Sequence, residues 1–146
     1  MGYRFDDLSS KVIAAAVEVH RQLGPGFLES VYEQALKIEL STRGIRFEAQ
    51  KEIRVAYGGQ VVGVHVLDLL VADELVLELK AVSRLEDAHY AQLRSYLRAT
   101  DKRVGLLMNF NTPTLTVKRL VFRYGEEATN QVGAEIQGYQ AAGKND

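Results

Sequence analysis

Residues 66–80, VLDLLVADELVLELK, place charged side chains inside two strongly apolar runs. Asp68 lies in the first run, Glu78 and Lys80 lie in the second, and a short polar break at residues 72–74 separates them. A charge in an apolar strand is costly to bury unless it is paired or bound to a cation. These two acids and the lysine are therefore the first candidates for a functional site. The alternative is a hairpin with a surface salt bridge.

The length of the break decides how the two acids lie. Strand side chains alternate between faces, so Val66, Asp68 and Leu70 are expected on one face. If the loop has three residues, Asp68 lies opposite Glu78 with Cβ atoms ~5 Å apart, whereas a two-residue loop puts them on opposite faces. Two carboxylates that close repel each other unless a proton or a cation lies between them.

The chain has no cysteine, so oxygen ligands point to a hard cation, Mg²⁺ or Mn²⁺. Glu78 and Lys80 share one face of their strand. Lys80 is therefore placed to orient or deprotonate a water molecule, or to stabilise charge that develops on a phosphate.

Periodicity and turn residues predict an α/β fold in the order ααβββαββ, with a mixed sheet of about five strands flanked by helices. Residues 1–124 are expected to form one domain. Residues 125–146 are polar and glycine-rich and are expected to form a tail that is weakly structured or helical. The expected helices cover residues 8–23, 28–43 and 84–100, and the expected strands cover residues 47–57, 61–71, 75–82, 103–110 and 114–122.

The net charge of −1 gives no overall attraction to polyanions, so contact with nucleic acid needs a local basic patch. Two arginine- and lysine-rich groups are candidates, and a solvated surface is the alternative for both. The two groups are Arg43, Arg46, Lys51 and Arg54, and Arg94, Arg98, Lys102 and Arg103.

No apolar run is long enough to span a membrane and no secretory signal pattern is present, so we expect a cytoplasmic protein that does not bind membranes.

Both flanking helices carry further candidates. Glu29 lies in the first turn of the second helix, where an acid also simply complements the helix dipole. His89, Gln92 and Tyr96 fall on one face of the third helix and offer hydrogen bonds to a phosphate, a water molecule or a carboxylate. A helix–sheet boundary without function is the alternative for this face. His20 is expected in the core or at its boundary.

The pattern D-x9-E-x-K across a hairpin, followed by a helix with Q-x3-Y, resembles the PD-(D/E)XK nuclease superfamily, and in particular its lambda-exonuclease-like branch. GFLESVY at residues 26–32 is similar to the signature of the small bacterial GxxExxY proteins within that superfamily. VHRQLGPG before it and GLLMNFN at residues 105–111 are similar to the same group. The resemblance covers about residues 8–122.

The resemblance implies a restriction-endonuclease-like core and metal-dependent cleavage of phosphodiester bonds. It implies that Asp68 and Glu78 bind the metal, with the backbone carbonyl of Leu79 as a further ligand, and that Lys80 is the catalytic lysine. Leu67 replaces the proline that precedes the aspartate in the family pattern, and proline binds no metal. The resemblance also assigns Gln92 and Tyr96 to the site, and Glu29 to the metal, directly or through water.

Two functions follow as hypotheses. The first is a Mg²⁺- or Mn²⁺-dependent nuclease whose partner is nucleic acid, expected to be DNA. The second is a nuclease-fold binding or scaffold protein without robust turnover. DNA against RNA, endo against exo action, and the formation of a homo-oligomer stay open from the sequence.

Overall fold

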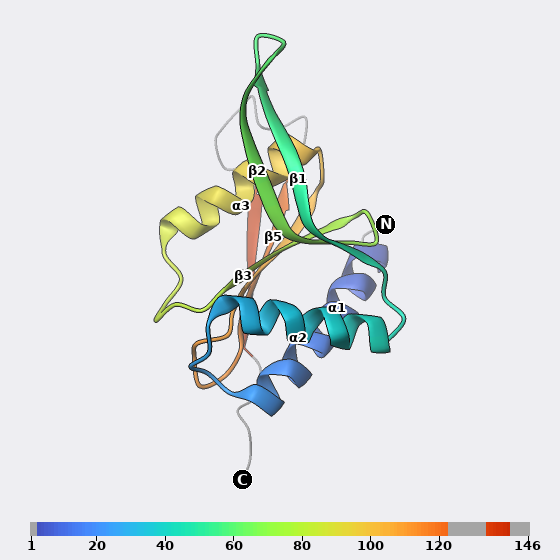
Figure 1. The fold of residues 1–146 in the computed structure, drawn as a ribbon, viewed down its shortest axis with the longest axis vertical. Helices are drawn as coiled ribbons and strands as arrows, with labels where there is room; N and C mark the ends of the chain where they lie inside the picture. The colour runs from blue at the N-terminus through green and yellow to red at the C-terminus, as the bar shows by residue number, and fades with distance from the viewer. Residues whose placement is uncertain (1–2, 123–133, 141–146) are drawn as a thin grey trace.

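The computed structural model describes residues 3–122 and 134–140, with side chains from residue 7 to residue 122. One mixed sheet forms the centre, with helices on both faces (Figure 1). The elements are α1 (Tyr3–Leu23), α2 (Glu29–Thr42), β1 (Phe47–Tyr57), β2 (Gln60–Val71), β3 (Leu75–Lys80), α3 (Asp87–Thr100), β4 (Val104–Asn109), β5 (Thr116–Phe122) and β6 (Ala134–Gln140). The expected α/β order ααβββαββ is confirmed, and a sixth strand follows it.

The strands lie in the order β1-β2-β3-β4-β5-β6, and each neighbouring pair is antiparallel except β3 and β4. Parallel strands cannot be joined by a tight turn, so α3 forms the crossover between them. The crossover places α3 against one face of the sheet. The end of β3 and the start of α3 are thereby held close together.

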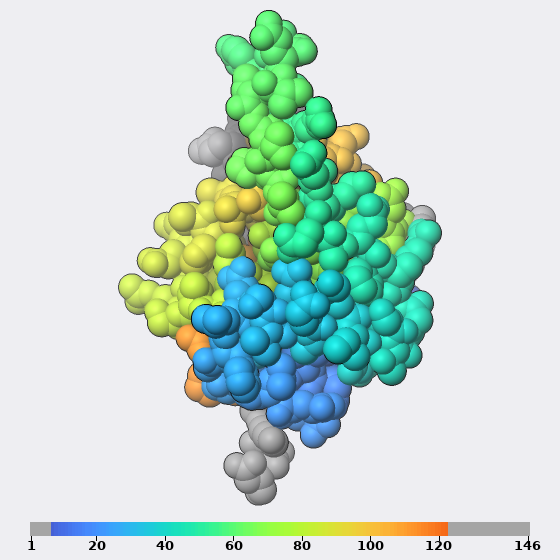
Figure 2. Space-filling view, viewed as in Figure 1, coloured from blue at the N-terminus to red at the C-terminus, as the bar shows by residue number. Residues whose placement is uncertain are grey.

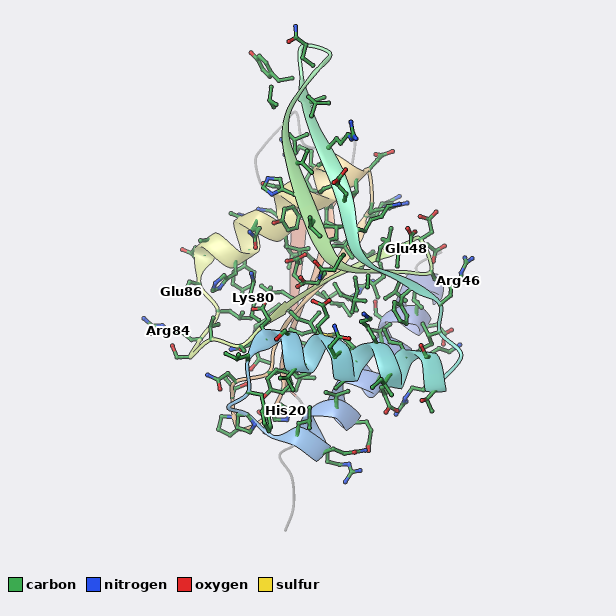
Figure 3. The ribbon with its side chains drawn as sticks, viewed as in Figure 1. His20, Arg46, Glu48, Lys80, Arg84 and Glu86 are labelled. Carbon is green, nitrogen blue, oxygen red and sulfur yellow. The ribbon has the colours of Figure 1, made fainter. Side chains whose placement is uncertain are left out.

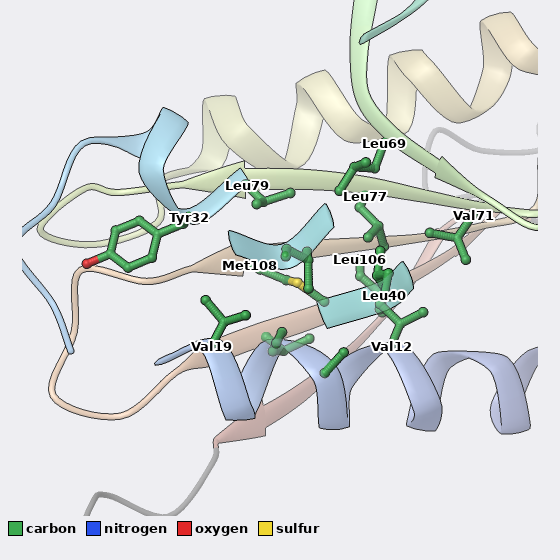
Figure 4. Packing of buried hydrophobic residues seen from close by; sticks show 14 of the residues in the cluster. Val12, Val19, Tyr32, Leu40, Leu69, Val71, Leu77, Leu79, Leu106 and Met108 are labelled. Atoms are coloured by element: carbon green, nitrogen blue, oxygen red, sulfur yellow. The ribbon is translucent and has the colours of Figure 1, made fainter. Parts of the chain in front are cut away.

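The two faces of the sheet carry separate apolar clusters. Side chains of α1 and α2, such as Val12, Tyr32 and Leu40, pack with Leu77 and Met108 of the sheet (Figure 4). On the other face, α3 packs its Leu93 and Leu97 against residues of β2 to β5. Strands β3 and β4 are buried along almost their whole length because both of their faces are covered.

The prediction for the C-terminal residues is wrong in part. Residues 134–140 were expected in a weakly structured or helical tail, but they form β6, which pairs antiparallel with β5 and sets Ile136 opposite Leu120. Without β6, β5 would present unpaired backbone groups at the edge of the sheet, beside its buried Leu120 and Phe122. Residues 123–133 and 141–146, the rest of that expected tail, lie outside the described residues.

The β1–β2 hairpin extends beyond the body of the molecule (Figures 1 and 2). Its turn is closed by the pair Tyr57 and Gln60, and Gly58 and Gly59 have φ angles of 59° and 79°. This left-handed conformation at both central positions confirms the predicted glycine turn. His20, as predicted, is buried, and its Nε2 lies 2.9 Å from the carbonyl oxygen of Thr112.

Gly105 of β4 sets how closely α3 approaches the sheet. A Cβ atom at this position would lie 2.8 Å from Cδ1 of the buried Leu93. We expect Gly105→Ala to lower the free energy of unfolding by about 1–3 kcal/mol, because overpacking displaces α3. Gly63→Ala in β2 is the matched control, since nothing lies within 4 Å of its added methyl group. Urea denaturation of both variants measures the difference, and equal midpoints would contradict the close packing at Gly105.

Candidate functional site

The connection between β2 and β3 meets the condition that the sequence left open. Strand β2 ends at Val71 and β3 begins at Leu75, so the loop has three residues. Leu69 pairs with Leu77, and the same register places Asp68 opposite Glu78. The two acids therefore face each other across neighbouring strands.

The backbone ladder between β2 and β3 stops at this point, and side chains replace it. The described pairs run from Val71 to Leu69, and the Leu79 N–H donates to Oδ2 of Asp68 at 2.8 Å. The Asp68 N–H lies 3.5 Å from Oε1 of Glu78. The carboxylates thus satisfy backbone groups that the separating strands no longer pair with each other.

Strand β2 bends at Asp68, and this corrects the expected alternation. Leu67 and Leu70 both pack in the cluster under α3, whereas Val66 is 45% exposed. In the register with β1, Gln50 is the residue opposite Asp68, and it has a left-handed φ of 52°. The outer part of the hairpin therefore turns relative to the sheet, and Asp68 lies at the bend.

Glu78 is buried, and Asp68 is partly buried. Glu78 is 4% exposed, and burial, followed by the charge of Asp68, raises its pKa to about 8. Burial also raises the pKa of Asp68 to about 6; the charges of Glu29 and Glu33 add to this, while the Leu79 N–H and Lys80 oppose it. The charge of Lys80 therefore does not offset the burial of the two carboxylates and the repulsion between acids.

Helix α3 brings Gln92 and Tyr96 close to the acids and to Lys80, the last residue of β3. Lys80 Nζ donates to Oε1 of Gln92 at 3.2 Å, and Figure 3 shows Lys80 between the ends of α3 and α2. Tyr96 is buried, and its pKa is raised by burial and by the charges of Glu78 and Asp68. His89, on the same expected face, instead caps the start of α3: its Nδ1 accepts a hydrogen bond from the Glu86 N–H at 2.9 Å.

Helix α2 begins beside the same acids. Glu29 is exposed, yet the surrounding chain desolvates its carboxylate enough to raise its pKa, while the charge of Lys80 and the Ala81 N–H oppose the rise. Tyr32, one turn further, is fully buried and fixes this end of the helix. Its hydroxyl donates to the Gly24 carbonyl at 2.6 Å and accepts from the Phe27 N–H at 3.1 Å.

Two residues near the site were not identified from the sequence. Glu33 accepts two hydrogen bonds from Nε2 of Gln50, at 3.0 and 2.8 Å, and so joins α2 to the bend in the hairpin. The spacing of Glu29 and Glu33, i and i+4 on one helix, was the available signal. Asn109 is 1% exposed and bonds both the N–H and the carbonyl of Val82, which holds the chain just beyond Lys80.

The residues present fit a hard divalent cation with few protein ligands. No group of three or more His, Cys, Asp or Glu side chains suited to a metal is found in the described part of the chain. However, Mg²⁺ commonly binds one or two carboxylates and keeps several waters. The Leu79 N–H points toward Asp68, and in a strand the carbonyl of the same residue points to the same side. Two carboxylates and one carbonyl oxygen therefore converge here.

A family model described as the PD-(D/E)XK nuclease superfamily matches residues 6–120. The chain belongs to this superfamily. The match contains every candidate residue from Glu29 to Tyr96, and the α/β architecture is consistent with the restriction-endonuclease-like fold. No curated protein and no solved structure matches the chain. Among the described residues, no helix is long and apolar enough to cross a membrane.

The raised pKa values predict how stability depends on pH. A carboxyl group whose pKa is higher in the folded state keeps its proton after the unfolded chain has lost it, so stability falls as pH rises between the two values. For Glu78 this interval runs from 4.5 to about 8. In metal-free buffer we expect the free energy of unfolding to fall across it, by at most about 1.4 kcal/mol per pH unit for each proton.

Glu78→Gln removes the titrating group and should flatten this fall. Glu52→Gln, which changes an exposed acid of β1, is the matched control and should keep the slope of the unaltered chain. Urea denaturation from pH 5 to pH 8 measures both slopes. Equal slopes for Glu78→Gln and the unaltered chain would show that Glu78 ionises normally in the folded state.

Proposed function

We propose that this protein is a Mg²⁺- or Mn²⁺-dependent nuclease that hydrolyses phosphodiester bonds of DNA in the cytoplasm. The observation that carries the proposal is the pair Asp68 and Glu78, opposed across two separating strands, with the pKa of each raised and Lys80 beside them. The membership of the superfamily supports the reaction class.

Asp68, Glu78 and the carbonyl of Leu79 would hold the cation, with Glu29 completing the site directly or through water. The cation, when bound, supplies charge that neutralises the scissile phosphate and lowers the pKa of a bound water. The pair of acids is suited to this role because a cation between them removes the repulsion that their burial strengthens.

Lys80 would act on the reacting groups. Its hydrogen bond to Gln92 of α3 limits the positions of the ammonium group, whose charge also acts on Glu29 of α2. In this position the ammonium group can orient the attacking water or stabilise charge on the phosphate. Tyr96 lies on the α3 side of the site, and its raised pKa keeps the hydroxyl neutral near the acids.

The resemblance to the GxxExxY group within the lambda-exonuclease-like branch is also part of the proposal. Two contacts within the resembling segments support it. Tyr32 holds the start of α2, and Asn109 holds the chain just after Lys80. These contacts explain why a site of this kind would need those residues.

A second candidate is a nuclease-fold protein that binds nucleic acid or another copy of itself without robust turnover. The exposed apolar side chains of the hairpin favour it, because such patches often mark interaction surfaces. They are Tyr57, Val61, Val62, Val64 and Val66.

Cleavage assays separate the two candidates. With Mg²⁺ or Mn²⁺ we expect cleavage of a DNA substrate from a panel of linear, circular, single-stranded and duplex molecules. Asp68→Ala and Lys80→Ala should each lower the rate at least about 100-fold, because each removes a group that acts in the transition state. Glu52→Ala, an exposed acid away from the site, is the control. Unchanged cleavage in both site variants would refute the mechanism, and no cleavage by the unaltered chain would favour the second candidate.

Metal binding can be measured without cleavage. We expect Mn²⁺ to raise the thermal midpoint of the unaltered chain, and Glu78→Gln to lose most of that rise, because ligands that bind the folded state stabilise it. The effect should grow from pH 5 to pH 8, since both acids must lose protons before they bind a cation. An equal rise in Glu78→Gln would place the metal elsewhere.

A further inference from the structure

A groove of about 880 Å³ separates α3 from the β1–β2 hairpin, next to the candidate site. Side chains of Tyr96, Arg94 and Arg98 line it from α3, and residues of β1 and β2 line it from the hairpin. Figure 1 shows α3 beside the hairpin. The full lining is Arg54, Val55, Ala56, His65, Ala91, Arg94, Ser95, Tyr96, Arg98 and Ala99.

The groove is basic although the chain as a whole is not. Its lining contains three arginines and a histidine and no acid, while the whole chain has a net charge of −1. Arg54 lies 3.8 Å from Glu52, so part of its charge is offset. Arg94 and Arg98 have no carboxylate partner among the described residues. The positive charge of the groove therefore comes mainly from one face of α3.

The groove leads to the acids through Tyr96. This side chain lines the groove, and the charges of Glu78 and Asp68 contribute to its raised pKa. Gln92, one turn earlier on α3, bonds Lys80. A chain of phosphates that occupied the groove would thus reach the site at the end nearest Lys80.

The dimensions and the lining favour one strand over two. The volume is in the range of small-molecule pockets, about 300–1,000 Å³, which leaves no room for a duplex between helix and hairpin. Proteins that bind single strands combine a basic groove with exposed rings on which bases stack. His65 is exposed, and its ring centroid lies 5.3 Å from that of Tyr96, with the two ring planes tilted by 52°.

We propose that this groove binds a single-stranded segment of nucleic acid and delivers it to Asp68 and Glu78. Arg94 and Arg98 contact successive phosphates and His65 stacks on a base. The inference rests on the proposed function, since it takes the acids as the point of cleavage. It adds that the strand which is cut is unpaired where it lies along α3.

Binding is tested apart from cleavage with the full chain carrying Asp68→Asn, which removes a proposed metal ligand. Fluorescence anisotropy compares a labelled single-stranded oligonucleotide with a duplex of the same length over a range of salt. We expect the single strand to bind more tightly, and Arg94→Gln/Arg98→Gln to weaken it at least about 10-fold. The salt slope should fall by about 1.4, since each phosphate contact on a single strand contributes about 0.7.

Arg21→Gln is the control, because Arg21 is exposed in the last turn of α1, a helix that packs on the opposite face of the sheet from α3. It should change neither affinity nor slope. Arg98 also lies over the ring of Phe122 at 5.3 Å, so the thermal midpoint of each variant is measured and Arg94→Gln is tested alone. His65→Ala should weaken binding without a change in the salt slope.

Failure of the inference differs from failure of the proposed function. Equal affinity of the double arginine variant and the control, or tighter binding of the duplex, would overturn the proposed single-strand binding in the groove even if the unaltered chain cleaves DNA. If the chain cleaves nothing while the arginine variants lose single-strand binding, the groove stands and the nuclease proposal fails.

Discussion

The hydrogen bond from the Leu79 N–H to the Asp68 carboxylate is the contact on which the site depends. It forms where β2 leaves β3, so a backbone donor that would otherwise lose its partner is satisfied by a side chain. The same bond fixes Asp68 opposite Glu78, in surroundings that raise the pKa of both. Without it, the Leu79 N–H would be unpaired where the strands separate, and the partly buried Asp68 carboxylate would lose a hydrogen bond that stabilises it there.

The elements around this bond each hold one part of the site. Tyr32 anchors the start of α2 through Gly24 and Phe27, which sets Glu29 beside the end of β3. Asn109 bonds both backbone groups of Val82, so the chain after Lys80 cannot turn away. The side chains of Tyr32 and Asn109 are buried and hydrogen-bonded, whereas Glu29 is exposed and Lys80 is partly exposed. Rigid support and accessible reacting groups are thus supplied by different residues.

The sequence predicted most of the fold because its signals are local. Helical periodicity, the glycine turn at residues 57–60 and the apolar strands gave the order of the elements. Whether Asp68 lies opposite Glu78 depended on whether the loop has two or three residues, which the sequence alone did not determine. The bend at Asp68 was not predictable, since it depends on the left-handed Gln50, held by Glu33 from another element. Strand β6 was missed because its pairing with β5, and not its own pattern, specifies it.

The bend also explains why the site and the basic groove occur together. Pairing between β2 and β3 ends at Leu69, so the outer part of the hairpin does not pair with β3. This part contacts α3 instead, where Ile53 is buried and the ring of His65 lies next to that of Tyr96. A straight β2 that continued to pair with β3 would engage the backbone groups around Asp68 and would carry the hairpin away from α3. One change of direction in β2 therefore opens the acids and forms the wall of the groove.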